Sequence, residues 1–229
     1  MKTFCFIFAR GGSKGLPGKN VKYLGGIPLL AHSIGLAKDM NEIDEVFVSS
    51  DSEEILSVAK KSGAKTIVRP KELSTDTAPE WMAWRHGVEE VISEYGEFDL
   101  FLSLPPTAPL RNKLDIKNCF LAMDKQTDMV ITVTPSNRSP HFNMIYRDEL
   151  GASKIILGDS QVIRRQDAPK VFDITTVAYL SRPSFILTNE GIFTGKVKSV
   201  VIPKERAIDI DDEIDFLLAE KIYERNNRS

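Results

Sequence analysis

The segment with the most evident chemistry is the loop Arg10 to Asn20, RGGSKGLPGKN, which combines four glycines with three basic side chains. Glycine lets backbone N–H groups turn toward an anion and approach it closely. Arg10, Lys14 and Lys19 add positive charge, and hydrogen bonds from such groups to phosphate oxygens are strong. The loop therefore predicts a triphosphate site. The alternative is a flexible basic surface loop.

Two well-known phosphate loops do not match this segment. A P-loop needs glycine, four residues and then Gly-Lys-Ser/Thr, but Ser13 lies five residues before Gly18, and Asn20 replaces the hydroxyl residue. A dinucleotide loop needs G-x-G-x-x-G, which the glycines at 11, 12, 15 and 18 do not form.

A pair of carboxylates, Asp209 and Asp211, precedes the last expected helix. Side chains of extended chain repeat every two residues, so both point to the same side. Magnesium in proteins takes one or two carboxylates together with phosphate oxygens and water. The pair is a candidate metal site. Capping of the next helix by Asp211 or Asp212 is an equally open interpretation at this point.

The elements that must position these residues alternate along the first 130 or so positions. Phe4 to Ala9 is a continuous apolar run, typical of a fully buried strand that leads into the basic loop. Strands are expected at 46–49, 66–68, 100–104 and 129–133, and helices at 28–38, 55–63, 79–92, 114–123 and 212–225. This alternation predicts an α/β fold whose mostly parallel sheet is covered on both faces.

The alternation of strands and helices ends after Pro135, where short apolar segments alternate with turns. We expect one domain over residues 1–229 with a small lobe at about 136–175, after which the chain rejoins the sheet. Ligands of open α/β sheets bind beyond the carboxyl ends of the strands, where the first loop would lie.

Composition excludes several classes of protein. The 229 residues carry a net charge of 30 − 32 = −2, unlike a generally basic nucleic-acid binder, so we expect no nucleic-acid partner. Two isolated cysteines make neither a disulfide framework nor a zinc site. The apolar run near the N-terminus is too short for a signal peptide or a membrane span. We expect a cytoplasmic protein with no membrane partner.

Several motifs in order resemble the cytidylyltransferases that make CMP-sialic acid and related sugars. The first loop resembles their signature, Arg69 to Ala78 (RPKELSTDTA) resembles their R-P-x-E-L-x-x-D-T-A segment, and Pro106 to Arg111 resembles their P-T-S-P-L-R. Arg164 to Pro169 and Ile208 to Asp211 resemble two later segments. The resemblance covers nearly the whole chain and implies a Rossmann-like nucleotidyltransferase fold, a three-layer sandwich with a small dimerisation extension.

The resemblance also implies roles for individual residues. CTP would be bound by Ala9, Arg10, Gly11, Gly12, Ser13, Lys14, Lys19, Asn20, Arg69, Asp76 and Thr77. A nine-carbon α-keto acid sugar would be bound by Pro105, Thr107, Arg111, Arg165, Gln166, Thr175 and Phe193. Asp209 and Asp211 would hold Mg²⁺ or Mn²⁺, and Arg10, Lys19 and Asp211 would act in catalysis. The segment around His141 would help to form a homodimer.

Two of these assignments have open alternatives. Arg164 and Arg165 are adjacent, so both cannot face one ligand from a regular strand, and a solvated pair is the other interpretation; the resemblance favours Arg165. An isolated phenylalanine such as Phe193 is more often a core residue than a ligand contact.

The expected reaction is in-line attack of the sugar's C2 hydroxyl on the α-phosphate of CTP, with release of pyrophosphate, driven mainly by positioning and electrostatics. No general base is evident; Asp211 and a hydroxide on the metal are candidates. A nucleotidyltransferase for another sugar, such as Kdo or pseudaminic acid, and a catalytically silent nucleotide-binding module are the alternatives.

The chain departs from the family pattern mainly around the sugar. Pro105 replaces a glutamine, Thr175-Thr176 replaces Asn-Gly, and Asp173 stands where some members have arginine. Glu80 takes the place of a serine near the cytidine pocket. These changes resemble the legionaminic-acid branch at least as much as the N-acetylneuraminate branch.

Overall fold

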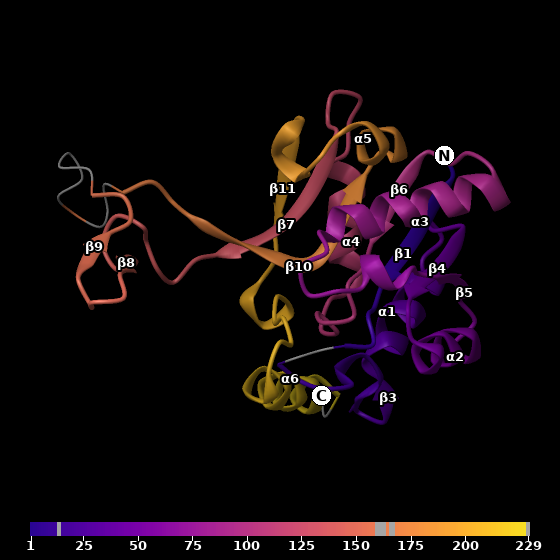
Figure 1. The fold of residues 1–229 in the computed structure, drawn as a ribbon, viewed down its shortest axis with the longest axis horizontal. Coiled ribbons are helices and arrows are strands. Elements are labelled where there is room, and N and C mark those ends of the chain that lie inside the picture. The colour runs from indigo at the N-terminus through magenta and orange to yellow at the C-terminus, as the bar shows by residue number, and fades with distance from the viewer. Residues whose placement is uncertain (13–14, 159–163, 165–167, 228–229) are drawn as a thin grey trace.

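A seven-stranded sheet forms the centre of the computed structural model, which describes residues 1–12, 15–158, 164 and 168–227 (Figure 1). The strand order is β11-β7-β10-β6-β1-β4-β5. Only β10 runs antiparallel to its neighbours, so the expected mostly parallel sheet is confirmed. The strands are β1 (Thr3–Phe8), β4 (Glu45–Ser50), β5 (Lys65–Val68), β6 (Leu100–Ser103), β7 (Met129–Pro135), β10 (Phe172–Ser181) and β11 (Val197–Val201).

Helices cover both faces of this sheet and form the outer layers of a three-layer sandwich (Figure 1). Alternation along β1 sends Cys5 and Ile7 to one face and Phe4 and Phe6 to the other. The first face packs against α1 (Leu29–Lys38), α2 (Glu53–Lys61) and α4 (Lys113–Ala122). The second packs against α3 (Glu80–Tyr95) and α5 (Pro183–Thr188). The first strand is therefore buried on both sides, as its apolar run predicts.

A separate apolar cluster joins the chain's last helix to its first loop. The helix α6 (Glu213–Asn227) packs Phe216 and Ala219 beside Leu24 and Leu29, close to the hairpin of β2 (Tyr23–Leu24) and β3 (Ile27–Pro28). Leu16, Leu110 and Ile210 belong to the same cluster. This packing holds the segment before α6 against the loop that follows β1 (Figure 1).

The expected lobe is an extension that projects from the main body on two connections (Figure 1). It carries a two-stranded antiparallel sheet of β8 (Ile145–Arg147) and β9 (Ser153–Ile155). Its expected upper limit of 175 is too high, because β10 begins at Phe172 and residues 172–175 pair with β7 in the central sheet. The short helix α5 was not predicted; its six residues give too little periodicity to identify.

The two cysteines are free and buried, and burial raises the pKa of both thiols. In the ranges that the structure describes, no helix is both long enough and apolar enough to cross a bilayer.

The aromatic centre of the second face provides a stability test. Phe6 is fully buried, and its ring stacks on Phe101 with 4.8 Å between centroids. We expect Phe6→Ala to lower the free energy of unfolding by about 3–5 kcal/mol, because lost transfer free energy and a cavity add together. Denaturant titration measures this change. The control Leu121→Ala, at a side chain that is 83% exposed, should change it by less than about 0.5 kcal/mol, and similar losses in both variants would contradict this packing.

Candidate active site

A pocket of about 340 Å³ opens at the carboxyl ends of β1 and β6, where the sheet predicts a ligand site. It brings together residues from the first loop, from the segment after β5, from the loop after β6 and from the segment before α6. Predicted site residues that line it are Arg10, Lys19, Asn20, Arg69, Asp76, Pro105, Thr107, Asp209 and Asp211. Residues some 200 positions apart in the chain thus share one cavity.

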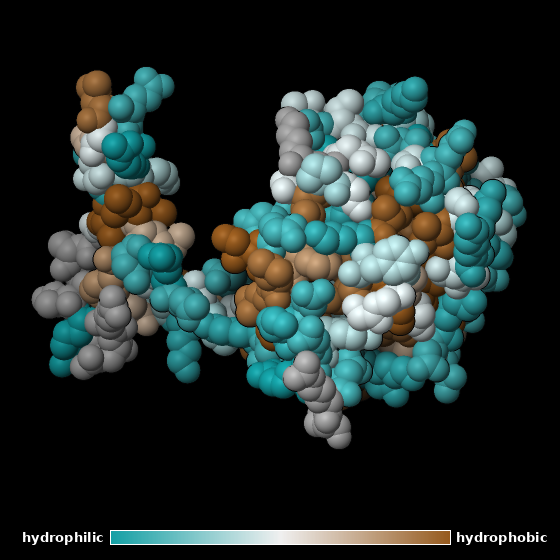
Figure 2. All heavy atoms as spheres, turned by 90° about the horizontal axis from the view of Figure 1, so that it is seen from below, coloured by the Kyte–Doolittle hydropathy of each residue, from teal (hydrophilic) through white to brown (hydrophobic). Residues whose placement is uncertain are grey.

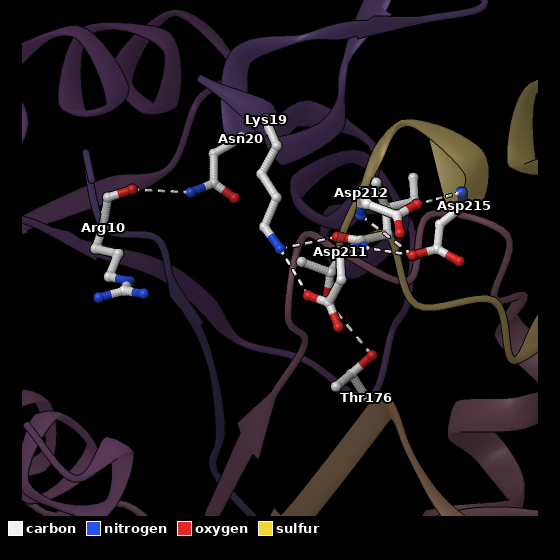
Figure 3. Close-up of polar contacts among 9 residues, drawn as sticks. Arg10, Lys19, Asn20, Thr176, Asp211, Asp212 and Asp215 are labelled. Atoms are coloured by element: carbon white, nitrogen blue, oxygen red, sulfur yellow. Dashed lines mark hydrogen bonds and ion pairs between the residues drawn. The ribbon is translucent and has the colours of Figure 1, made fainter. Parts of the chain in front are cut away.

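The basic loop and the acidic pair are in direct contact. The ammonium group of Lys19 donates to Asp211 Oδ1 at 3.0 Å and to the carbonyl oxygen of Ile210 at 2.8 Å (Figure 3). The side chain of Lys19 is only 14% exposed, while that of Asp211 is 76% exposed. The loop and the acidic pair therefore form one centre.

Gly15 permits this close approach. A Cβ atom at this position would collide with the backbone carbonyl oxygen of Asp211. Any larger residue must push the loop away from the acidic segment, because a backbone atom cannot swing aside as a side chain can. One of the loop's glycines is thus required by packing against Asp211.

Helix capping in this segment is carried out by Asp212. Its Oδ1 accepts hydrogen bonds from the backbone N–H groups of Ile214 and Asp215 at 2.8 and 3.0 Å. Asp215 Oδ2 in turn accepts from the N–H groups of Asp211 and Asp212 (Figure 3). This reciprocal arrangement is a capping box built from aspartates. Asp209 and Asp211 need not cap α6, and both side chains face the pocket.

The acidic pair has the chemistry of a divalent-cation site. Asp209 Oδ1 is buried and lacks a hydrogen-bond partner among the described residues, and Asp209 lines the pocket. Burying a carboxylate oxygen without a hydrogen-bond donor or a cation costs free energy, because its lost hydration is not replaced. Within the described ranges, no cluster of three or more His, Cys, Asp or Glu side chains suits a metal. Two carboxylates still fit Mg²⁺, which draws its other ligands from phosphates and water.

Two groups of the first loop, the Arg10 guanidinium and the Gly11 amide, are held by acidic partners. Arg10 Nη1 lies 2.6 Å from Asp76 Oδ1, in an ion pair between two predicted nucleotide residues. The N–H of Gly11 donates to Asp51 Oδ1 at 3.0 Å. Asn20 is buried, and its Nδ2 donates to the carbonyl oxygen of Arg10 at 3.0 Å (Figure 3). Asn20 therefore fixes the backbone of Arg10, while Asp76 and Asp51 hold its side chain and the next amide.

Three other predicted nucleotide residues occupy peripheral positions. Ala9 is buried, and its N–H donates to the carbonyl oxygen of Ser49 as a continuation of the sheet, so this amide is not available to a phosphate. Gly12 and Thr77 are exposed and outside the pocket lining; Thr75, two residues before Thr77, lines the pocket in its place. Ser13 and Lys14 lie outside the described residues.

Arg69 is held rigidly at the wall of the pocket. Its Nε donates to Ser49 Oγ at 3.2 Å and its Nη2 to the Ser49 carbonyl oxygen at 2.6 Å. Its guanidinium carbon lies 5.7 Å from the centre of the Phe8 ring. Burial lowers the pKa of Arg69, and the charge of Asp51 opposes that shift. Phe8 lines the pocket and was not among the predicted residues.

Three of the residues expected to bind the sugar do not line the pocket in this structure. Arg111 is buried outside the pocket lining, where its guanidinium donates to Ser33 Oγ at 2.7 Å and to the carbonyl oxygens of Pro105 and Thr176. Burial lowers its pKa to about 10. Arg111 therefore supports the loop of Pro105 instead of reaching a ligand.

Thr175 is buried and donates to Thr132 Oγ1 at 2.8 Å, so it points away from the pocket. Its neighbour Thr176 lines the pocket instead. Phe193 is 68% exposed and precedes β11, which places it at the amino edge of the parallel strands, opposite the pocket. Arg165 and Gln166 lie outside the described residues, and Arg164 does not line the pocket.

A second cavity of about 480 Å³ lies at the base of the extension. Its lining comes from residues 135–143 and 168–172 and contains none of the predicted site residues. The pocket at the carboxyl edge is therefore the candidate active site.

Comparison with known proteins agrees with this assignment. A family model described as Cytidylyltransferase matches residues 4–141. The chain is 32% identical over 230 residues to the post-translational flagellin modification protein B of Campylobacter coli, covering 99% of this chain and 97% of that protein. It is 31% identical to the CMP-N,N'-diacetyllegionaminic acid synthase of Campylobacter jejuni, covering 100% and 97%. It is 32% identical to a pseudaminic acid cytidylyltransferase of the same species, covering 100% and 99%.

The fold also matches solved structures. A CMP:2-keto-3-deoxy-manno-octonic acid synthetase in complex with CTP aligns with a TM-score of 0.72 at 16% identity, covering 99% of this chain and 100% of the other. This likeness confirms the expected nucleotidyltransferase fold.

The division of labour among the aspartates can be tested by stability. Asp212→Ala removes the acceptor for two N–H groups of α6, and we expect the free energy of unfolding to fall by about 0.5–2 kcal/mol. Asp211→Ala should change it less, because an exposed ion pair contributes little. Urea titration of both variants measures this. An equal or larger loss for Asp211→Ala would show that Asp211 carries the capping role.

Proposed function

The chain belongs to the cytidylyltransferase family, and on that premise we propose that it transfers CMP from CTP to a nine-carbon α-keto acid sugar, with release of pyrophosphate. The observation that carries the proposal is the contact of Lys19 with Asp211, which places a cationic phosphate loop and a carboxylate pair in one pocket. Relatives named for legionaminic and pseudaminic acids support a nonulosonic acid as the acceptor. The legionaminic or N-acylneuraminic type is our proposal, and pseudaminic acid is the alternative.

The triphosphate binds where the ligand-free pocket holds carboxylates against cations. Arg10 exchanges Asp76 for a phosphate oxygen, and Lys19 exchanges Asp211 in the same way. Guanidinium and ammonium groups in this position stabilise the negative charge that develops on departing pyrophosphate. Because Lys19 is largely buried, this electrostatic contribution is screened by water less than a surface charge would be.

Asp209 and Asp211 bind Mg²⁺ or Mn²⁺ in this proposal, and the cation supplies charge neutralisation at the phosphates. The partnerless Oδ1 of Asp209 supports this role. Release of Lys19 from Asp211 on CTP binding would free the second carboxylate, so nucleotide and cation binding are expected to favour each other.

The acceptor sugar lies along the loop after β6. Pro105, Pro106 and Thr107 line the pocket with Thr176, and the hydroxyls of Thr107 and Thr176 are 3.4 Å apart. These two hydroxyls can donate to a polar sugar and orient it. Positioning of the attacking hydroxyl against the α-phosphate is then the main contribution of the protein to the rate.

The proposal is tested by pyrophosphate release from purified protein with CTP, Mg²⁺ and a panel of keto-acid sugars. We expect release with CTP and at least one nonulosonic acid. We expect Asp209→Asn to reduce kcat by about 10²–10³-fold, the cost of removing one preorganised electrostatic group. Asp39→Asn, at a carboxylate that is 73% exposed and outside the pocket lining, is the matched control and should retain most activity. Nucleotide binding without turnover in the parent would instead identify a silent binding module.

We also propose that the protein is a homodimer formed through the extension. A two-stranded sheet is marginally stable by itself, because it has too little apolar surface to bury. Here it and its connections expose Ile145, Tyr146, Leu150, Phe172 and Ile174, and Figure 2 shows hydrophobic side chains on the projecting part. Exposed apolar area of this kind is typical of an interaction surface. A cytoplasmic location stays a prediction from the two unpaired thiols.

Light scattering after size-exclusion chromatography tests the dimer. The parent should elute at twice the mass of the chain. Ile145→Asp buries a charge in the proposed interface and should shift the population toward monomer. Leu121→Asp, on the exposed face of α4, is the matched control and should leave the mass unchanged. A monomeric parent would contradict the proposal.

A further inference from the structure

The pocket contains an acidic side chain that the proposed chemistry does not use. Glu80 is the first residue of α3 and lines the pocket beside Arg69. Glu80 is exposed at the pocket surface, and partial loss of hydration there raises the pKa of its carboxyl group. The indole N–H of Trp84 and the charge of Arg69 oppose that shift and favour the ionised carboxylate. Because a carboxylate repels a triphosphate, the presence of Glu80 in this pocket calls for a separate role.

Glu80 and Arg69 are both fixed in place. Trp84 Nε1 donates to Glu80 Oε1 at 3.3 Å, and Trp84 is buried among the rings of Trp81 and Phe101. Arg69 is held by its two hydrogen bonds to Ser49. An acceptor and a donor group therefore stand in defined positions before any ligand arrives, which is a requirement for discrimination between similar ligands.

The surroundings of this pair suit a flat heterocycle. Phe8, Ala78 and Ala83 line the same pocket and supply apolar surface for the faces of a ring. Together with the pair, the pocket lining therefore offers apolar surface for a ring and a donor and an acceptor for its edge. A nucleobase is the part of CTP with this character.

The acceptor of Glu80 and the donor of Arg69 complement the hydrogen-bonding edge of cytosine and not that of uracil. Cytosine has an exocyclic amino group that donates and a ring nitrogen that accepts, whereas uracil has a carbonyl oxygen in place of the amino group. A carboxylate accepts from the cytosine amino group, as it does in recognition of that base in nucleic acids. The same carboxylate facing the carbonyl oxygen of uracil would be repelled and would lose its hydration without replacement.

We propose that Glu80 is a base-specificity residue, which accepts a hydrogen bond from the amino group of cytosine while Arg69 donates to the acceptor edge, and so selects CTP over UTP. This inference rests on the proposed function only in that CTP is the nucleotide bound. It adds a role for Glu80 that is separate from the acidic pair at Asp209 and Asp211.

Calorimetric titration of the full chain with CTP and with UTP, in Mg²⁺ and without sugar, tests the inference. The parent should bind CTP more tightly. We expect Glu80→Gln to reduce the ratio of the two affinities by roughly tenfold to a hundredfold, because a glutamine amide can present either a donor or an acceptor. Glu80→Asp keeps an acceptor and should retain a preference for CTP. Glu90→Gln makes the same charge change on an exposed position of α3 and should leave the ratio unaltered.

Equal affinities of the parent for CTP and UTP, or an unchanged ratio in Glu80→Gln, would overturn the inference. Thermal melting of each variant shows whether it is folded, and Glu80→Asp provides the comparison if Glu80→Gln is not. Pyrophosphate release is measured on the same samples. A parent that selects CTP but never releases pyrophosphate would refute the transferase proposal and leave the role of Glu80 standing.

Discussion

The structure depends on one constraint: three connections far apart in the chain must meet at the carboxyl edge of the sheet. The backbone N–H of Ile210 donates to the carbonyl oxygen of Thr107 at 2.8 Å, and the carbonyl oxygen of Ile210 accepts from Lys19. The Ile210 side chain packs in the same cluster as Leu16. One residue thus joins the first loop, the loop after β6 and the segment before α6, and the carboxylates on either side of it are positioned as a consequence.

Two buried charged side chains, Asp115 and Arg111, stabilise this junction from within the protein. The carboxylate of Asp115 accepts hydrogen bonds from the Arg206 guanidinium at 2.9 Å, and it also completes the capping box of α4 with Asn112. Because Arg206 lies just before the acidic pair in the chain, this ion pair holds that segment against the main body. Arg111 holds the carbonyl oxygens of Pro105 and Thr176 from within the core. Desolvating a guanidinium is costly, and its hydrogen bonds offset that cost only if the two loops keep their places. The supporting residues are therefore as necessary to the pocket as those that line it.

The sequence predicted well what local patterns determine and poorly what depends on strand register. Alternating strands and helices located the sheet, and residue types near the strand ends located Arg10, Lys19, Asp209 and Asp211 in one pocket. The resemblance placed Thr175 at the sugar, but Thr176 lines the pocket, and which of the two faces it depends on the register shift between Thr175 and Tyr179. The Thr132 hydroxyl, which bonds the backbone of Thr175 and Ala178 there, belongs to a distant part of the sequence. Nor does local sequence reveal that Arg111 points inward, or that Phe193 precedes a strand at the far edge. Those positions follow from the order of strands in the sheet.

Among the described residues, two of the three cations that line the pocket, Arg10 and Lys19, are paired with carboxylates, whereas Arg69 is held by Ser49. The ion pairs of Arg10 with Asp76 and of Lys19 with Asp211 neutralise two of the lining cations before substrate arrives. Such pairs limit mutual repulsion of the cations and hold their side chains extended toward the cavity, which lowers the entropy lost on binding. In the proposed reaction, a triphosphate with its cation would replace both kinds of partner at once, whereas a lone anion would replace only the carboxylates and leave them unpaired. If the proposed function holds, this charge pattern would therefore favour the metal–nucleotide complex over either component alone.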